Sequence, residues 1–523
     1  MAMIRTILSD LGIPETASGV RFILMLAGLI ACIAITVFVL GTTAFGKYPA
    51  QAQYGTILIL GMIAIFALKP GPLARDGKVT NADLLLSLVF IGMALWSSIY
   101  FLNNYFEIAD LREGIPNTQD IICYSLGTFC VLEAARRVEG WMLLSVVIAA
   151  IIYLFFGHYM PGILEHRPFS PSQVIEISYS YQGIYGVALA AVSDVVLVFV
   201  ILGVALRISG AGDFFNYIAM KFTQGRRSGP AQCAIIASSL FGSVNGSAPA
   251  NVSATGVLTI PMMKRAGYKA PFAGAVEATS SCVGQILPPI MGVGAFIMSE
   301  ITGIPYANIM LAALIPAFLF ILSLSCAVAF EAGRTGLEPI DFGRVDWTSK
   351  RVDQGVTLLA GFGTLITMLI IGYAQTFCGL VATGLVLVLA NAFPATRLDT
   401  SKVVQFFVDG GRDGLAVLAS CAAIGIVIGA VTTTGLGIKL NQVIVALGNE
   451  QLFLALVLAG LCSIVLGMGL PTAASYIMVI FVAGPAIMEL GVGLLQTHLF
   501  VFYYAVLSAI TPPVALAVFA AAA

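Results

Sequence analysis

Long apolar stretches alternate with short polar loops along almost the whole chain. A helix needs about 20 apolar residues to cross a hydrocarbon core of about 30 Å, and many of the stretches approach or exceed that length. We therefore predict an all-α polytopic membrane protein. The predicted membrane elements lie at 21–41, 54–69, 83–102, 119–136, 140–157, 184–208, 229–263, 270–299, 306–330, 354–372, 376–394, 414–434, 451–488 and 494–523.

Two of the longest stretches are interrupted near their middle by glycine, proline and small polar residues. Residues 229–263 hold the run GSVNGSAPANVSATG (Gly242–Gly256), and residues 451–488 hold GMGLPTAAS (Gly467–Ser475). Neither stretch contains Asp, Glu, Lys or Arg. Irregular backbone at membrane depth is expected only where protein or a water-filled cavity covers it, because an unpaired backbone group facing lipid is costly. Both breaks therefore point to the interior of the protein.

The charges around the two stretches predict how each enters the membrane. Arg226 and Arg227 precede the first stretch, and Lys264 and Arg265 follow its apolar part. Since Lys and Arg favour the cytoplasmic side, both ends are expected there, and the stretch should turn back as a re-entrant hairpin. A single straight span with positive charge outside is the alternative. The flanks of the stretch 451–488 carry no basic cluster, so this hairpin is expected to enter from the extracytoplasmic side.

The same rule predicts a cytoplasmic N-terminus.

The order of elements is repeated in the two halves of the chain. Each broken stretch is followed by an apolar stretch with a double proline, Pro288-Pro289 in the first half and Pro512-Pro513 in the second. The same order with opposite sidedness is typical of inverted-topology repeats. The predicted organisation is a helical membrane unit at 1–158 that serves as a scaffold, a linker at 159–183, and a transport domain at 184–523 with repeats at 184–330 and 354–523.

Composition excludes several classes of function. Of the 523 residues, 59% are hydrophobic and 10% are charged, and the net charge is −1. Soluble proteins carry about 25% charged residues, so lipid is the main solvent here, and no nucleic-acid partner is expected. The nine cysteines form no Cys-x-x-Cys pair and the three histidines no metal-spaced set, so no cofactor is indicated. Walker, Gly-x-Ser-x-Gly and His-Glu-x-x-His motifs do not occur, so we expect no enzyme and no ATP coupling within the chain.

Oxygen atoms suited to a small cation gather at both breaks. Unpaired carbonyls and side-chain oxygens suit Na⁺, and the N-termini of half-helices suit a carboxylate. The alternative is that Gly, Ser and Pro only allow close packing and kinks. Two matched breaks favour the binding site over that alternative. The side-chain oxygens belong to Asn245, Ser247, Asn251, Ser253 and Thr255 in the first break, and to Thr472, Ser475 and Thr511 around the second.

Two carboxylates lie within the predicted membrane elements. Glu277 is a candidate functional carboxylate, because an ionisable group at membrane depth is costly and rare and usually marks a functional site. A structural role, for example pairing with Asn or backbone amides, is the alternative for Glu277. For Asp194 the structural interpretation is favoured.

Long runs around both breaks resemble a known family. Ser238–Tyr268 and Ala273–Glu300 in the first half, with Leu466–Val479 and His498–Ala517 in the second, look like the large membrane subunit of tripartite ATP-independent periplasmic (TRAP) transporters. The resemblance implies secondary transport driven by a Na⁺ gradient, with no other cofactor. It also implies a periplasmic binding protein that delivers an organic acid, an elevator motion of the hairpins, and a bacterial inner-membrane location.

The resemblance extends to a fused form of this family. Glu277 and the run RRVEGW (Arg136–Trp141) resemble chains in which the small four-helix and large subunits are joined, and such chains commonly work with TAXI-type binding proteins. That family usually continues beyond the position of Ala523, so a truncated C-terminus is expected.

The site residues are carried over from the family as expectations. Its sodium ions lie between each hairpin tip and the following broken helix. The resemblance places one Na⁺ site at Asn245, Ser247, Gly284, Leu287 and Pro288, and the other at Gly467, Gly469, Thr472, Thr511 and Pro512. Ser247, Asn251 and Thr472 are the candidates near the substrate.

Two other functions were weighed against this one. A stand-alone Na⁺/dicarboxylate symporter would have similar hairpins and no binding protein, but the additional unit at 1–158 favours the tripartite system. An ion-pumping subunit of a redox complex would need a series of intramembrane Lys, Glu or His, whereas only Glu277 and Asp194 stand out.

Overall fold

The computed structural model describes residues 11, 13, 19–73, 79–339, 346–447, 451–512 and 514–523. Within these residues the regular elements are all helical, and ten helical segments are long and apolar enough to cross a membrane. The predicted all-α polytopic fold is confirmed. The chain divides into two compact units, one of residues 1–201, 399–446 and 481–485 and the other of residues 202–398, 447–480 and 486–523.

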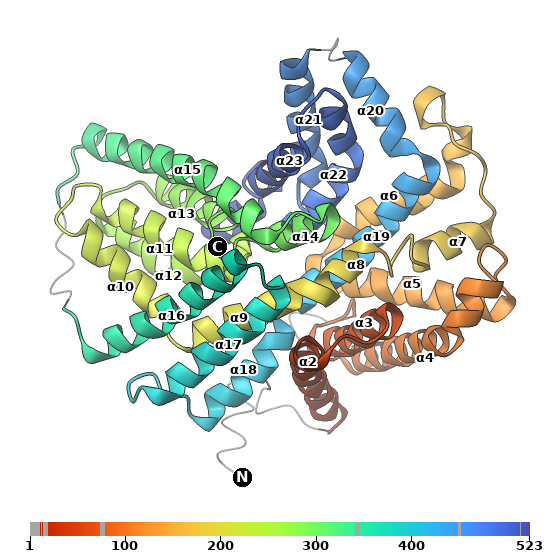
Figure 1. The fold of residues 1–523 in the computed structure, drawn as a ribbon, viewed down its shortest axis with the longest axis horizontal. Coiled ribbons are helices and arrows are strands. Elements are labelled where there is room, and N and C mark those ends of the chain that lie inside the picture. The colour runs from red at the N-terminus through yellow and green to blue at the C-terminus, as the bar shows by residue number, and fades with distance from the viewer. Residues whose placement is uncertain are drawn as a thin grey trace. The chain divides into compact units, whose positions relative to one another are not determined.

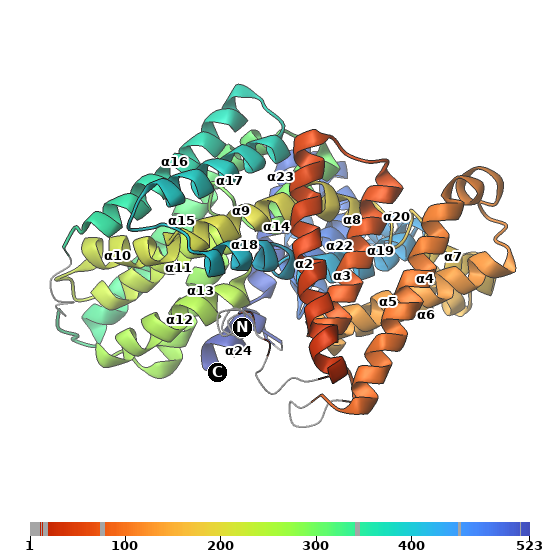
Figure 2. The same ribbon diagram turned by 90° about the horizontal axis from the view of Figure 1, so that it is seen from below.

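The first unit is built around one late helix, α19. This helix packs against α3, α5, α6 and α7, and nearly all of its side chains are buried. Another late helix, α18, lies along α2 (Figure 2). The helices of this unit are α2 (Gly19–Phe45), α3 (Ala50–Leu68), α4 (Asn81–Leu111), α5 (Thr118–Glu139), α6 (Trp141–Phe156), α7 (Pro171–Tyr179), α8 (Val187–Ala191), the π-helix η3 (Val192–Val196), α18 (Thr400–Arg412), α19 (Leu415–Thr434) and α20 (Leu436–Leu447), with 3₁₀ turns at Gly157–Tyr159 and Gly162–Leu164. The end of α20 passes into the second unit.

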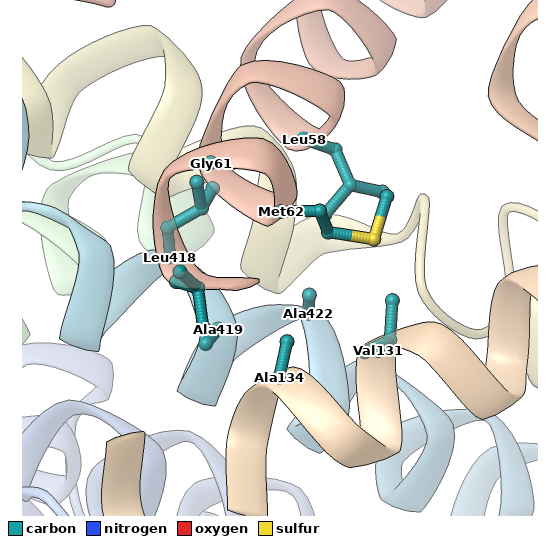
Figure 3. Close-up of a pocket in the computed structure, with 9 residues that line it drawn as sticks. Leu58, Gly61, Met62, Val131, Ala134, Leu418, Ala419 and Ala422 are labelled. Atoms are coloured by element: carbon teal, nitrogen blue, oxygen red, sulfur yellow. The ribbon is translucent and has the colours of Figure 1, made fainter. Parts of the chain in front are cut away.

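A small gap in the first unit shows how closely α19 fits its neighbours. The gap measures about 10 Å³ and lies between α3, α5 and α19 (Figure 3). Its walls are apolar, including Met62, Val131 and Leu418. A water molecule needs about as much space and two or more polar partners, so this gap is a packing defect and not a site for a polar ligand.

The second unit contains both interrupted stretches. Its first half places α11, α12 and α13 side by side (Figure 1), and α24 lies against α12 and α13 (Figure 2). The helix α9 (Leu197–Ile208) begins in the first unit and continues into this one. The other helices are α10 (Ala211–Thr223), α11 (Gly229–Asn245), α12 (Ala248–Arg265), α13 (Ala270–Gly284), α14 (Val293–Thr302), α15 (Tyr306–Arg334), α16 (Ser349–Ile371), α17 (Gln375–Ala392), α21 (Leu452–Gly467), α22 (Thr472–Glu489), α23 (Leu494–Ser508) and α24 (Leu516–Ala522). Of α22, residues 481–485 belong to the first unit.

Each predicted hairpin is a helix, a short turn and a second helix. The turn between α11 and α12 contains Gly246 with φ +70°, and the turn between α21 and α22 contains Gly469 with φ +75°. Glycine adopts this left-handed backbone at no steric cost, so it can reverse the chain within a few residues. Each double-proline stretch is also divided, between α13 and α14 and between α23 and α24. Pro513 lies outside the described residues.

The helices α7 and α18 lie outside the membrane elements that the pattern of apolar residues predicts. The helix α18 carries Lys402, Asp409 and Arg412 among its apolar residues, so it does not form an apolar run. The helix α7 lies in the polar linker at 159–183, where Pro171 occupies its first turn and Ser170 caps it. Short amphipathic helices of this kind are found by caps rather than by hydropathy.

Candidate functional site

At the first hairpin tip, two helices touch through their backbones. A Cβ atom on Gly284 of α13 would lie 2.4 Å from the Cα atom of Gly242 on α11. Real Cβ contacts are not this short, so the crossing admits no side chain at position 284. This crossing holds the last turn of α11, which ends at the predicted ligand Asn245, against the end of α13, where the first double-proline break begins.

At the second hairpin tip, the corresponding crossing contains a side chain. Ser508, at the end of α23, donates a hydrogen bond from its hydroxyl to the carbonyl oxygen of Gly467 at 3.0 Å. A Cβ atom on Gly467 would lie 2.8 Å from the Ser508 hydroxyl oxygen. The predicted ligand Gly467 is therefore fixed to the helix that leads into Thr511 and Pro512.

The two double-proline breaks have matching backbone conformations. Met291 (φ +65°) and Ala515 (φ +40°) are the only non-glycine residues with positive φ in the part of the chain that the structure describes. Each stands at the same place in its break, as the third residue after the first proline. Such backbone is disfavoured for side chains with a Cβ atom and is concentrated at functional sites. The match supports two equivalent repeats.

One hydrogen bond joins the two repeats at their breaks. The hydroxyl of Thr472, the first residue of α22, donates to Gln285 Oε1 at 2.8 Å. Gln285 is 1% exposed and follows α13 directly. The second hairpin tip thus contacts the first broken helix. Sequence reasoning named Thr472 but missed Gln285, although Gln285 is the only amide side chain in the run GQILPP and could have been singled out for that reason.

The predicted residues of the first tip have different surroundings. Ser247 is half-buried and is the N-cap of α12, and its side chain makes no capping hydrogen bond. Asn251 is fully buried, and its Nδ2 donates to the carbonyl oxygen of Ser238 at 2.7 Å. Gly284, Leu287 and Pro288 line the first break. Ser247 is therefore open to a ligand at the tip, whereas Asn251 holds α12 against α11.

In the second repeat, Thr472 and Thr511 differ in what their hydroxyls contact. The Thr511 hydroxyl donates to the Leu507 carbonyl oxygen in its own helix at 2.8 Å. Gly467, Gly469, Thr472 and Pro512 lie at the tip and the break as the sequence places them. Assignment of all these residues to ligands stays a prediction.

Glu277 lies in a buried cluster of hydroxyl groups. Its Oε1 lies 2.6 Å from the Ser238 hydroxyl oxygen and 2.5 Å from that of Thr255, and its Oε2 lies 2.5 Å from the Thr259 hydroxyl oxygen, all within hydrogen-bond distance. These partners are hydroxyls of α11 and α12, and not the amide groups that the structural interpretation suggested. The carboxyl group thus ties both arms of the first hairpin to α13.

Asp194 belongs to the first unit. It lies on η3, where its Oδ2 accepts a hydrogen bond from Tyr54 at 3.2 Å and lies 3.3 Å from Lys47 Nζ. The ion pair accords with the structural interpretation. Among the described residues, no group of three or more His, Cys, Asp or Glu side chains is placed to hold a metal ion.

Paired helical hairpins and paired broken helices in a chain with ten helical segments long and apolar enough to cross a membrane are typical of membrane transporters. The model of one family matches residues 126–523, and that family is the DctM component of the tripartite ATP-independent periplasmic transporters. The chain belongs to this family of TRAP transporter permeases.

Two relatives that carry a TRAP transporter name agree with the family, and a third relative is uncharacterized. A putative TRAP transporter large permease protein of Haemophilus influenzae is 21% identical over 325 residues, which cover 60% of this chain and 74% of that protein. The C4-dicarboxylate TRAP transporter large permease protein DctM of Pseudomonas aeruginosa is 23% identical over 303 residues, 57% of this chain and 69% of that protein. The uncharacterized protein y4mL of Sinorhizobium fredii is 27% identical over 210 residues, and the match spans 40% of this chain and 45% of y4mL.

Proposed function

We propose that this chain is the permease of a Na⁺-coupled secondary transporter that imports small carboxylates delivered by a periplasmic binding protein. The observation that carries the proposal is the Thr472–Gln285 hydrogen bond, because it brings the second hairpin tip to the first broken helix. A hairpin tip of one repeat and a double-proline break of the other thus meet inside one unit, and such a compact site is expected for a transporter. Na⁺ is the coupling ion, and no other cofactor is needed.

The helix N-termini at the tips support a carboxylate substrate. The helices α12 and α22 both begin at a tip, and neither receives a capping hydrogen bond from its N-cap side chain. The first N–H groups of a helix and its dipole favour an anion. Named relatives act on C4-dicarboxylates and 2,3-diketo-L-gulonate, which are carboxylates as well. The substrate is proposed to lie between Ser247 and Thr472.

The tip oxygens support sodium. The carbonyl oxygens of Gly284, Leu287 and Gly467, together with the Ser247 hydroxyl, are hard ligands of the kind that unwound backbone offers to Na⁺. Residues 1–158 are proposed to act as a fused small subunit and static scaffold, past which the hairpins move in an elevator motion. The binding protein is proposed to be of the TAXI type, and the N-terminus to face the cytoplasm of an inner membrane.

Reconstitution of the full chain in liposomes tests the proposal. Uptake of C4-dicarboxylates and keto acids is measured with and without an inward Na⁺ gradient and with and without the candidate binding protein. We expect uptake only when both are present. Uptake that needs Na⁺ and not the binding protein would identify a stand-alone symporter, and uptake that ignores both would refute the proposal.

A matched pair of variants tests the first tip. Ser247→Leu fills the half-buried tip with an apolar side chain and removes an oxygen ligand, so Na⁺-dependent uptake should be abolished while membrane insertion is retained. Ser253→Leu is the control, because Ser253 lies on the same helix with an exposed side chain. An unchanged Na⁺ affinity in Ser247→Leu would remove the first tip as a cation site.

A further inference from the structure

The Glu277 cluster contains a carboxyl group without a positive partner. Glu277, Ser238, Thr255 and Thr259 are at most 3% exposed. Among the described residues, Glu277 forms no ion pair, and the ionisable groups on the elements packed against it are not within ion-pair distance. A buried ionised carboxylate is very costly unless it is paired. The ionisable groups on those elements are Cys233 on α11, Lys264 and Arg265 on α12, Lys269 before α13, Cys282 on α13, and Tyr306, Cys326, Glu331 and Arg334 on α15.

The cluster has no room for a metal ion between its oxygen atoms. The three hydroxyl oxygens lie 2.5–2.6 Å from the carboxyl oxygens, which is direct hydrogen-bond contact. A cation at the centre would have to separate these atoms. The remaining way to remove the charge is a proton on the carboxyl group.

The hydrogen bonds around Thr259 can be satisfied together only by an additional proton. The Thr259 hydroxyl oxygen lies 2.5 Å from Glu277 Oε2 and 3.0 Å from the Thr255 carbonyl oxygen. A hydroxyl has one proton, so it can donate to only one of these two acceptors. If Glu277 Oε2 carries a proton and donates it to Thr259, the Thr259 hydroxyl is free to donate to the Thr255 carbonyl. Oε1 still accepts from Ser238 and Thr255.

We propose that Glu277 is a proton-binding site, occupied in this structure, and that the neutral carboxylic acid fastens both arms of the first hairpin to α13. The acid donates to Thr259 on α12 and accepts from Ser238 on α11. Ser238 lies four residues before Gly242 on α11, and Glu277 lies seven residues before Gly284 on α13, so this bond set holds the hairpin about one to two turns from the Gly242–Gly284 crossing. Loss of the proton would leave an unpaired charge between three helices and would loosen the hairpin.

Infrared spectroscopy of the purified full chain tests the proton directly. At neutral pH the spectrum of the wild type minus that of Glu277→Gln should contain the C=O band of a protonated carboxylic acid, and the spectrum of the wild type minus that of Glu300→Gln should lack it, because Glu300 is exposed on α14. A Glu277 difference spectrum without this band would overturn the proposal. If Glu277→Gln does not fold, Thr259→Val serves instead. It removes the acceptor of the proton and should shift the band, and an unshifted band would also overturn the proposal.

Uptake tests the fastening role, and this part rests on the proposed function. The amide of Glu277→Gln can donate to Thr259 and accept from Ser238, so its uptake should stay within about twofold of the wild type, whereas Glu277→Ala should lose at least about tenfold. An ionised carboxylate would predict equal losses, and equal losses would overturn the fastening role. The infrared measurement needs neither sodium nor substrate. Its result therefore tests the proton on Glu277 independently of the transport proposal.

Discussion

The two repeats share a backbone plan and differ at the point where hairpin and broken helix cross. In the first repeat, Gly242 and Gly284 meet without any side chain between them. In the second, Ser508 stands at the position equivalent to Gly284, four residues before the first proline, and its hydroxyl bonds to Gly467. The first crossing is therefore set by backbone contact alone, and the second by a hydrogen bond that permits a small side chain.

The buried polar groups of the two repeats differ as well. The first repeat buries Glu277 among three hydroxyls, whereas the second buries His498, whose Nδ1 lies 2.7 Å from the Tyr476 hydroxyl. Both arrangements join a hairpin arm to the following helix. The two halves thus have in common where helices are tied together and not which side chains tie them.

The largest expected effect comes from adding one methyl group at the first crossing. Gly284→Ala places a Cβ atom 2.4 Å from the backbone of Gly242, and backbone atoms cannot rotate away. We expect a loss of about 1–3 kcal/mol or more in the free energy of unfolding and the loss of uptake, measured by thermal unfolding and liposome assay. Gly467→Ala mainly meets the hydroxyls of Ser475 and Ser508, which can rotate, so its effect should be smaller.

Gly363→Ala is the control for both variants, because a Cβ atom at position 363 on α16 has no neighbour within 4 Å. It should behave as the wild type does. Equal losses in Gly284→Ala and Gly467→Ala would show that the two crossings are not different.

A smaller effect is expected from breaking the bond between the repeats. Thr472→Val keeps the shape of the side chain and leaves Gln285 Oε1 buried without its partner, which should cost about 1–3 kcal/mol. The bond joins the second hairpin tip to the first double-proline break, and both carry proposed Na⁺ ligands. The Na⁺ concentration for half-maximal uptake should therefore rise when the bond is lost. Thr472→Ser retains the hydroxyl and should restore the wild-type value. An unchanged Na⁺ dependence in Thr472→Val would show that the tips do not act together.

Much of this architecture could be predicted from the sequence because glycine, proline and charge act locally. The apolar stretch at 414–434 corresponds to α19 (Leu415–Thr434), and both hairpins turn where Gly246 and Gly469 allow it. In contrast, the order of the chain predicts α19 in the second repeat, whereas the helix packs in the first unit. A helix that is apolar on every side carries no signal of which neighbour it will bury against.

The contacts of the site were harder to predict because they join distant parts of the chain. Thr472 and Gln285 are 187 residues apart in sequence, so neither residue identifies the other. Thr255 and Thr259 stand four residues apart and share one face of α12, which indicates a polar stripe. That the stripe faces Glu277 follows only from the packing of α12 against α13.

The smallest expected effect comes from the second crossing itself. Ser508→Ala keeps the Cβ atom and removes the hydroxyl, which lies 3.0 Å from the Gly467 carbonyl oxygen and 2.7 Å from that of Ala505. We expect a loss of about 0.5–1.5 kcal/mol in thermal unfolding and uptake close to the wild type. Ser463→Ala is the control, because the Ser463 hydroxyl bonds only within α21. If the two serine variants unfold alike, the bond to Gly467 adds nothing. If Ser508→Ala is as damaging as Gly284→Ala, the second crossing is as rigid as the first.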